Sequence, residues 1–69
     1  MNKYKYAELH GKIIAKFGTL TAYAKEMNLN ANSVTNKLMG RTPWKQKEIT
    51  ETSKALNFNA EETALYFLL

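Results

Sequence analysis

Residues 20–40 read LTAYAKEMNLNANSVTNKLMG and predict a helix, a tight turn and a second helix. The first helix, residues 20–27, stops at Asn28, and asparagine is the commonest residue other than glycine in the left-handed conformation that a tight turn uses. Asn30 is a good N-cap residue, so the second helix is expected over residues 31–39.

The helix expected over residues 31–39 has one narrow apolar stripe and a large polar surface. Its strong apolar positions are Val34 and Leu38. Its other positions include Asn32, Ser33, Thr35, Asn36 and Lys37, and none of its residues is acidic. Because Asn, Ser and Thr are mediocre helix formers, this composition indicates a surface kept for its exposed chemistry rather than for helix propensity.

Another helix is expected before this pair. Apolar residues recur at steps of three and four over residues 6–17, which is one face of a helix, and Gly18 provides its C-cap. Gly11 lies in the middle of that helix, where glycine costs roughly 1 kcal/mol relative to alanine. The glycine therefore predicts a neighbouring helix that crosses closely at this point.

Two more helices are expected in the last third of the chain. Proline is favoured at the first position of a helix, so a helix is predicted to start at Pro43 and to continue to about Leu56. Trp44 is expected to anchor the preceding loop in the core. Asn59 and Glu62 form a capping-box pattern that starts a short last helix.

Composition supports an all-α fold, a compact five-helix bundle. The chain has four β-branched aliphatic residues against eight Ala and eight Leu, which favours helix over strand. Its 69 residues suit a single domain, residues 1–69, and exclude a two-domain enzyme. With no cysteine and a single histidine, His10, the chain lacks the ligands of a zinc finger or an iron–sulfur site, so no metal and no cofactor are expected.

Charge is unevenly distributed along the chain, whose net charge is +4. Residues 1–47 carry nine cations against two acids, a net +7, whereas residues 48–69 carry one against four, a net −3. This asymmetry indicates either a polyanion-binding face or an ordinary solvated surface, and charge alone leaves both open. No apolar run approaches the roughly 20 residues of a membrane span, and the N-terminus lacks the apolar stretch of a secretory signal, so we expect a cytoplasmic protein with no membrane partner.

The spacing within residues 20–40 matches a DNA-binding helix-turn-helix. Ala24, Asn28 and Val34 supply a small residue where the helices cross, a turn residue four positions on and a branched apolar residue in the second helix. Here the sequence resembles the phage Cro/repressor class. More closely, it is similar to small bacteriophage regulators with the pattern GKIIxKFGTxxxxAxxxxLxxxSxxxKLxGxTPW, present over residues 11–44.

This resemblance covers nearly the whole chain and implies a lambda-repressor-like DNA-binding domain. It implies that the helix over residues 31–39 lies in the major groove with Ala31, Asn32, Ser33 and Asn36 toward base edges. The chemistry agrees, because Asn can bond adenine N6 and N7, Ser can serve either base type and an Ala methyl can meet a thymine methyl. An ordinary solvated helix surface is the alternative.

Phosphate contacts are expected on both sides of that helix. The residues concerned are Thr19, Asn30, Lys37, Arg41, Thr42, Lys45 and Lys47. For Lys45 and Lys47, the alternative that they are ordinary surface lysines with no phosphate contact has equal weight.

The resemblance implies a sequence-specific transcriptional regulator, a Cro-like repressor that binds double-stranded operator DNA in the host bacterial cytoplasm and blocks polymerase by occupancy. The alternative is an antirepressor or protein-interaction module that keeps the fold but binds a protein partner. The chain offers no nucleophile–base pair, no Gly-rich phosphate loop and no aspartate, so we expect no enzyme, no catalytic residue and no small-molecule partner.

The apolar tail of the chain predicts a dimer contact. Tyr66, Phe67, Leu68 and Leu69 are consecutive apolar residues at a chain end, and only part of a helical turn can face the core. We expect them to form the interface of a weak homodimer that is completed on DNA. The alternative is that the tail folds back over the first helix near Gly11, and the two are compatible.

Overall fold

The computed structural model describes residues 4–68, and all regular structure in that range is helical. The helices are α1 (Ala7–Phe17), α2 (Leu20–Glu26), α3 (Ala31–Met39), α4 (Gln46–Ala55) and α5 (Ala60–Phe67). The prediction of an all-α, five-helix chain is confirmed for these residues. No helix within them is both long and apolar enough to cross a bilayer.

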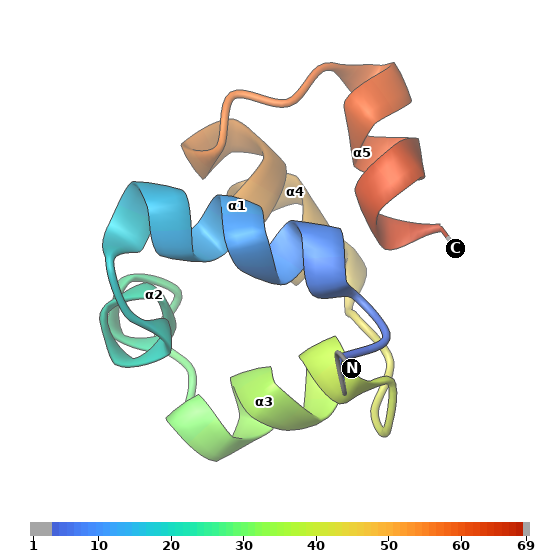
Figure 1. The fold of residues 1–69 in the computed structure, drawn as a ribbon. Coiled ribbons are helices and arrows are strands. Elements are labelled where there is room, and N and C mark those ends of the chain that lie inside the picture. The colour runs from blue at the N-terminus through green and yellow to red at the C-terminus, as the bar shows by residue number, and fades with distance from the viewer. Residues whose placement is uncertain (1–3, 69) are drawn as a thin grey trace.

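Helix α1 is the central element of the fold. Figure 1 shows it across the middle of the molecule, with α3 below it and α5 above it at the right. It packs against α2, α3 and α5, and α4 packs against α5. The N–H of Tyr6 donates to the carbonyl of Leu38 at 3.0 Å, so the start of α1 lies beside the end of α3.

The core draws on four of the helices. Its buried apolar side chains are Leu9, Ile13, Tyr23, Ala24, Val34, Leu38 and Phe67. Val34 and Leu38 have no exposed surface, which confirms the narrow apolar stripe predicted for α3. Each buried Leu, Ile, Val or Phe side chain stabilises the fold by about 1.5–3 kcal/mol relative to an exposed position.

Helix α4 contributes buried polar side chains instead. Thr52 has no exposed surface, and its hydroxyl lies 2.5 Å from the hydroxyl of Tyr23. Thr52 also donates to the sulfur of Met27 at 3.9 Å. Burial raises the pKa of Tyr23 above its ordinary value, although the hydrogen bond with Thr52 partly offsets this. A satisfied hydroxyl pair thus ties α2 to α4 inside the core.

The predicted start of α4 at Pro43 is wrong by three residues, because the helix begins at Gln46. Glu48 accepts the N–H of Lys45 at 2.9 Å, which fixes Lys45 as the N-cap. Trp44 precedes the helix, and its ring packs on those of Tyr6 and Phe67. Proline propensity is here overridden by a side-chain cap and a tertiary anchor.

The prediction of a close helix crossing at Gly11 is also wrong. A Cβ added at Gly11 would have no atom within 4 Å, and the residue is exposed. The glycine therefore lies on an exposed face of α1, and no helix within residues 4–68 crosses closely there.

Candidate functional site

The corner between α2 and α3 has the tight-turn geometry that the sequence predicts. Asn28 has a φ of 58°, in the left-handed region. The N–H of Leu29 donates to the carbonyl of Ala24 at 2.7 Å, which satisfies one of the free carbonyls at the end of α2. The side-chain oxygen of Asn30 accepts the N–H of Asn32 at 2.7 Å and caps α3. Local hydrogen bonds thus set the direction in which α3 leaves the turn.

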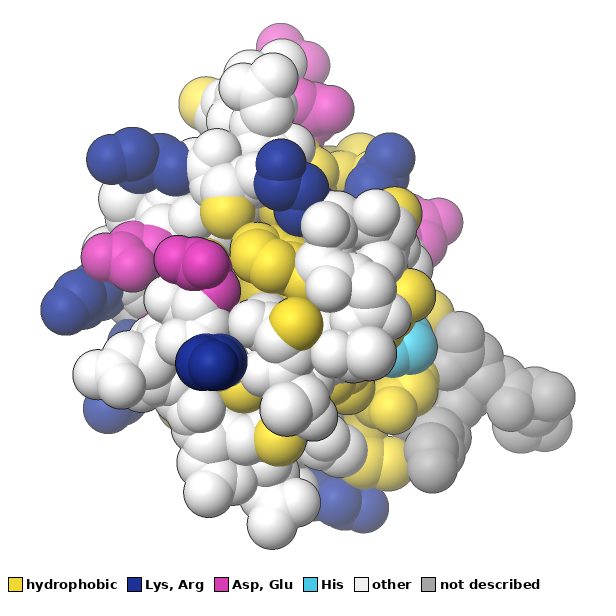
Figure 2. Space-filling view, turned by 90° about the vertical axis from the view of Figure 1, so that its left-hand side faces the viewer, with side chains coloured by type: hydrophobic (Ala, Val, Ile, Leu, Met, Phe, Trp, Pro, Cys, Tyr) yellow, Lys and Arg dark blue, Asp and Glu magenta, His cyan; other side chains and the backbone are white. Residues whose placement is uncertain are grey.

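The outward surface of α3 is polar and lacks negative charge. Asn32 is exposed, whereas Ser33, Thr35 and Asn36 are half-buried. Figure 2, which looks at the molecule from the α2 side, shows no acidic side chain at its lower end, where α3 lies. A surface with short donors and acceptors and no carboxylate is compatible with a polyanion or a base edge.

The residues expected to contact bases differ in their accessibility. Asn32 is the most open of them, while Ala31 is half-buried and packs against the core. Asn36 is half-buried, and its side-chain oxygen accepts a hydrogen bond from Arg41 at 3.2 Å. The structure therefore offers Asn32 most directly to a ligand and couples Asn36 to the next loop.

The loop of residues 40–45 runs beside the end of α3. It begins at Gly40, whose φ of 86° gives the left-handed C-cap of α3. The N–H of Arg41 donates to the carbonyl of Asn36 at 2.9 Å, and its guanidinium contacts the same residue's side chain. Arg41, Thr42, Lys45 and, just beyond the loop, Lys47 are all exposed. These four predicted phosphate-contacting residues therefore have side chains open to solvent: Arg41 and Thr42 directly follow α3, and Lys45 and Lys47 line a cavity with Asn28 and Leu29 of the turn before it.

Lys37 is placed differently from the other predicted phosphate-contacting residues. It is 7% exposed, and its ammonium lies 3.0 Å from a carboxylate oxygen of Glu48 and 3.2 Å from the carbonyl of Pro43. A cation that is buried and already paired has no free charge to offer a phosphate. Its expected role is therefore corrected to an internal contact between α3, the loop and α4.

Thr19 and Asn30 use their side chains as helix caps. The hydroxyl of Thr19 accepts the N–H of Ala22 at 3.0 Å, and Asn30 caps α3 as described above. Both residues are exposed. Each side-chain oxygen thus has a structural partner at the start of its helix.

Trp44 anchors the loop, as the sequence predicts. Its ring is half-buried and meets those of Tyr6 and Phe67 edge-on, with centroids 6.2 Å and 5.2 Å away. The indole nitrogen is buried and has no hydrogen-bond partner within the part of the chain that the structure describes. Edge-to-face packing of this kind holds the middle of the loop against α1 and α5.

Lys5 is a cation beside this site that was not among the predicted phosphate-contacting residues. A Cβ added at Gly40 would lie 2.7 Å from the Cδ of Lys5, so the lysine stem runs directly over the glycine. The ammonium lies 5.7 Å from the centroid of the Tyr6 ring. Because the two residues are 35 positions apart, only the packing of α1 on α3 brings this charge to the end of α3.

The last helix, α5, and the residue after it carry exposed apolar side chains. Phe67 is 4% exposed and belongs to the core, whereas Leu68 is 74% exposed, and Leu69 lies outside the described residues. Tyr66 is half-buried and stacks on Phe58 with centroids 4.6 Å apart. Leu65, which the sequence reading did not single out, is 62% exposed. Of the predicted tail contacts, Tyr66 and Leu68 therefore retain accessible apolar surface.

A shallow groove runs beside these leucines, between the start of α1 and α5. Its volume is about 300 Å³. It is lined by Lys5, Tyr6, Ala7, Glu8, Leu9, Leu65 and Tyr66. The groove is thus lined by both apolar and charged side chains.

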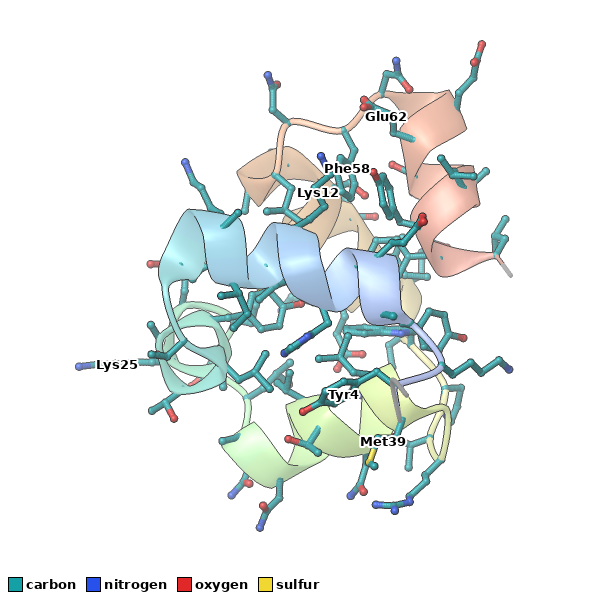
Figure 3. All side chains as sticks on the ribbon, viewed as in Figure 1. Tyr4, Lys12, Lys25, Met39, Phe58 and Glu62 are labelled. Atoms are coloured by element: carbon teal, nitrogen blue, oxygen red, sulfur yellow. The ribbon has the colours of Figure 1, made fainter. Side chains whose placement is uncertain are left out.

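Some acidic side chains lie away from α3, whereas Glu48 is paired with Lys37 of that helix. In Figure 3, Glu62 lies beside Lys12 and Phe58 at the top of the molecule, whereas Met39 of α3 lies near the bottom. Glu61 and Glu62 belong to the first turn of α5, where they suit the helix dipole. Within residues 4–68, no three His, Cys, Asp or Glu side chains gather as a metal site.

Comparison with known families gives one relevant finding. Residues 2–69 match the family described as "Protein of unknown function (DUF739)". None of the curated proteins matches the sequence. The match covers the full range of helices described above.

Proposed function

We propose that this chain, which belongs to the DUF739 family, is a sequence-specific DNA-binding regulator whose α2 and α3 form a helix-turn-helix. In this proposal α3 enters the major groove of duplex DNA, and the exposed cations beside it contact phosphates. We propose a binding protein rather than an enzyme. In this proposal the bound domain represses transcription by occupying its site.

The observation that carries the proposal is that an uncharged polar surface on α3 lies beside exposed cations. The helix is held by the buried Val34 and Leu38, yet its outward side chains are short, polar and free of negative charge. Arg41 and Lys45 lie exposed on the loop that follows, and Lys5 lies across Gly40. The uncharged polar side chains of α3 suit hydrogen bonding to base edges, and the cations beside them suit contact with the flanking phosphates.

A second copy of the chain completes the proposed complex. One recognition helix covers only a few base pairs, so two-fold pairing on half-sites about 34 Å apart would supply specificity. The exposed Leu65 and Leu68 and the half-buried Tyr66 support a contact at the α5 end. So small a surface supports only a weak dimer in free solution.

The proposal is tested by selecting binding sites from a pool of random duplexes and then measuring affinity by fluorescence anisotropy. We expect the selected duplex to bind more tightly than a scrambled one. Between 50 and 200 mM salt, both affinities should fall steeply, by about 10³ if roughly six phosphates are engaged. Failure to bind any duplex at 50 mM salt would contradict the proposal and favour a protein-interaction module.

A further inference from the structure

A buried ion pair lies behind the loop that carries the exposed cations. The Lys37 ammonium of α3 is 3.0 Å from an oxygen of Glu48 on α4, and the two side chains are 9% and 11% exposed. The same ammonium donates to the carbonyl of Pro43 at 3.2 Å. The same Glu48 oxygen accepts the N–H of Lys45 at 2.9 Å. One ion pair thus holds two backbone groups of the loop.

Further contacts hold the remainder of the loop. Arg41 is bonded to Asn36 through both its backbone and its guanidinium. Trp44 is held between the rings of Tyr6 and Phe67. Of all these contacts, only those of the ion pair described above are hydrogen bonds to the backbone of Pro43 and Lys45.

A contribution to the stability of the fold is a weak explanation for the presence of a buried ion pair. Removing two charges from water is costly, and well-packed apolar residues of similar volume often stabilise a fold equally well or better. Apolar residues, however, cannot donate to the carbonyl of Pro43 or accept the N–H of Lys45. What the pair supplies beyond packing is therefore a defined position for the loop backbone.

We propose that the Lys37–Glu48 pair positions the second half of the loop so that Lys45 meets a phosphate of duplex DNA at a fixed separation from α3, while Arg41 is held by Asn36. This inference rests on the proposed DNA-binding function. Lys37 and Glu48 are positioning residues in it and touch no phosphate. The cations on the loop make the contacts.

The test replaces both charges together, in the double variant Lys37→Met and Glu48→Met. One cation and one acid are lost, so the net charge of the chain stays at +4 and its long-range attraction to DNA is preserved. The matched control is Lys54→Met with Glu61→Met, which removes an exposed cation from α4 and an exposed acid from α5. Circular dichroism and urea unfolding establish that both variants fold.

We expect the folded Lys37/Glu48 variant to bind the selected duplex at least tenfold more weakly than wild type, with a salt dependence reduced by about one phosphate contact. The control variant should keep wild-type affinity. Trp44 is the single tryptophan of the chain and lies within the loop, so its emission reports the loop directly. The Lys37/Glu48 variant should show increased quenching by acrylamide, and the control should not.

Two outcomes would overturn the proposal, and they differ. If wild type binds duplex and the folded variant binds with the same affinity and salt dependence, the positioning role is wrong while the DNA-binding function stands. If wild type binds no duplex, both the function and the role built on it are wrong. In that second case, increased Trp44 quenching in the variant would still show that the pair fixes the loop, but for another purpose.

Discussion

The α3 end and the α5 end of the molecule expose opposite kinds of side chain. At the α3 end, the apolar residues Val34 and Leu38 are fully buried, and Asn32 faces solvent. At the α5 end, Leu65 and Leu68 are largely exposed although Phe67 is buried beside them. Polar groups at one end suit a polar ligand, while exposed leucines at the other suit an apolar contact. Two surfaces of different chemistry thus occupy one small domain.

The largest effect should come from breaking the buried side of α3. Leu38→Ala removes a side chain with no exposed surface and should reduce the free energy of unfolding by about 2–5 kcal/mol, enough to unfold much of so small a domain. Leu65→Ala, at an exposed leucine, is the matched control and should change it by less than about 0.5 kcal/mol. Urea denaturation followed by circular dichroism measures both. Equal losses in the two variants would mean that the two ends are not packed as described.

The next effect concerns the outward side of the same helix. Asn32→Ala should leave stability nearly unchanged, because the cap on Asn30 uses only the backbone N–H of residue 32. It should cost about 1–3 kcal/mol of binding to the selected duplex and relax preference at one base position. Competition assays with singly substituted duplexes check this. An equal loss of affinity for selected and scrambled DNA would show that Asn32 does not contact a base.

A smaller and less selective effect is expected at the loop. Lys45→Ala should weaken binding to selected and scrambled duplexes alike and reduce the salt slope by about 1. Lys54→Ala, which removes an exposed cation from the far end of α4, is the control and should alter neither quantity appreciably. Anisotropy titrations at several salt concentrations measure the slope. A loss confined to the selected duplex would place Lys45 on a base instead.

The smallest effect should come from the open face of α1. Gly11→Ala meets no atom within 4 Å in a helix interior and should stabilise the fold by about 0.5–1 kcal/mol. Gly18→Ala meets equally open space, but φ there is 87°, so it should destabilise the fold by about 1–2 kcal/mol. Thermal unfolding separates the two. A loss of stability in Gly11→Ala would instead support the close helix crossing that the sequence predicted at this residue.

The helices and the turn were predictable because their causes are local. Periodic apolar residues specify α1 and the buried stripe of α3, and short-range caps specify where α3 and α5 begin. Asn28 was assigned to the turn from its tolerance of left-handed backbone, and its φ of 58° confirms that assignment. Sequence spacing of one to four residues carries all of these signals.

The corrections come from contacts between distant residues. Lys37 was expected among the phosphate contacts that flank α3, but its partner Glu48 lies 11 positions away on another helix. The rings of Tyr6 and Phe67, on which Trp44 packs, are likewise distant from it in the sequence. A polar residue, Thr52, lies fully buried because it finds the hydroxyl of Tyr23. None of these partners is marked by local pattern.

The difference between the two ends can be measured directly by titrating ¹⁵N-labelled protein with the selected duplex and following its amide resonances. We expect the largest chemical-shift changes at Asn32, Ser33 and Asn36 of α3 and at Arg41 and Lys45 of the loop. The amides of α5 should shift less, and by an amount that depends on protein concentration if a second copy joins there. Changes concentrated on α5, with the resonances of α3 unmoved, would contradict the assignment of α3 as the DNA-binding surface.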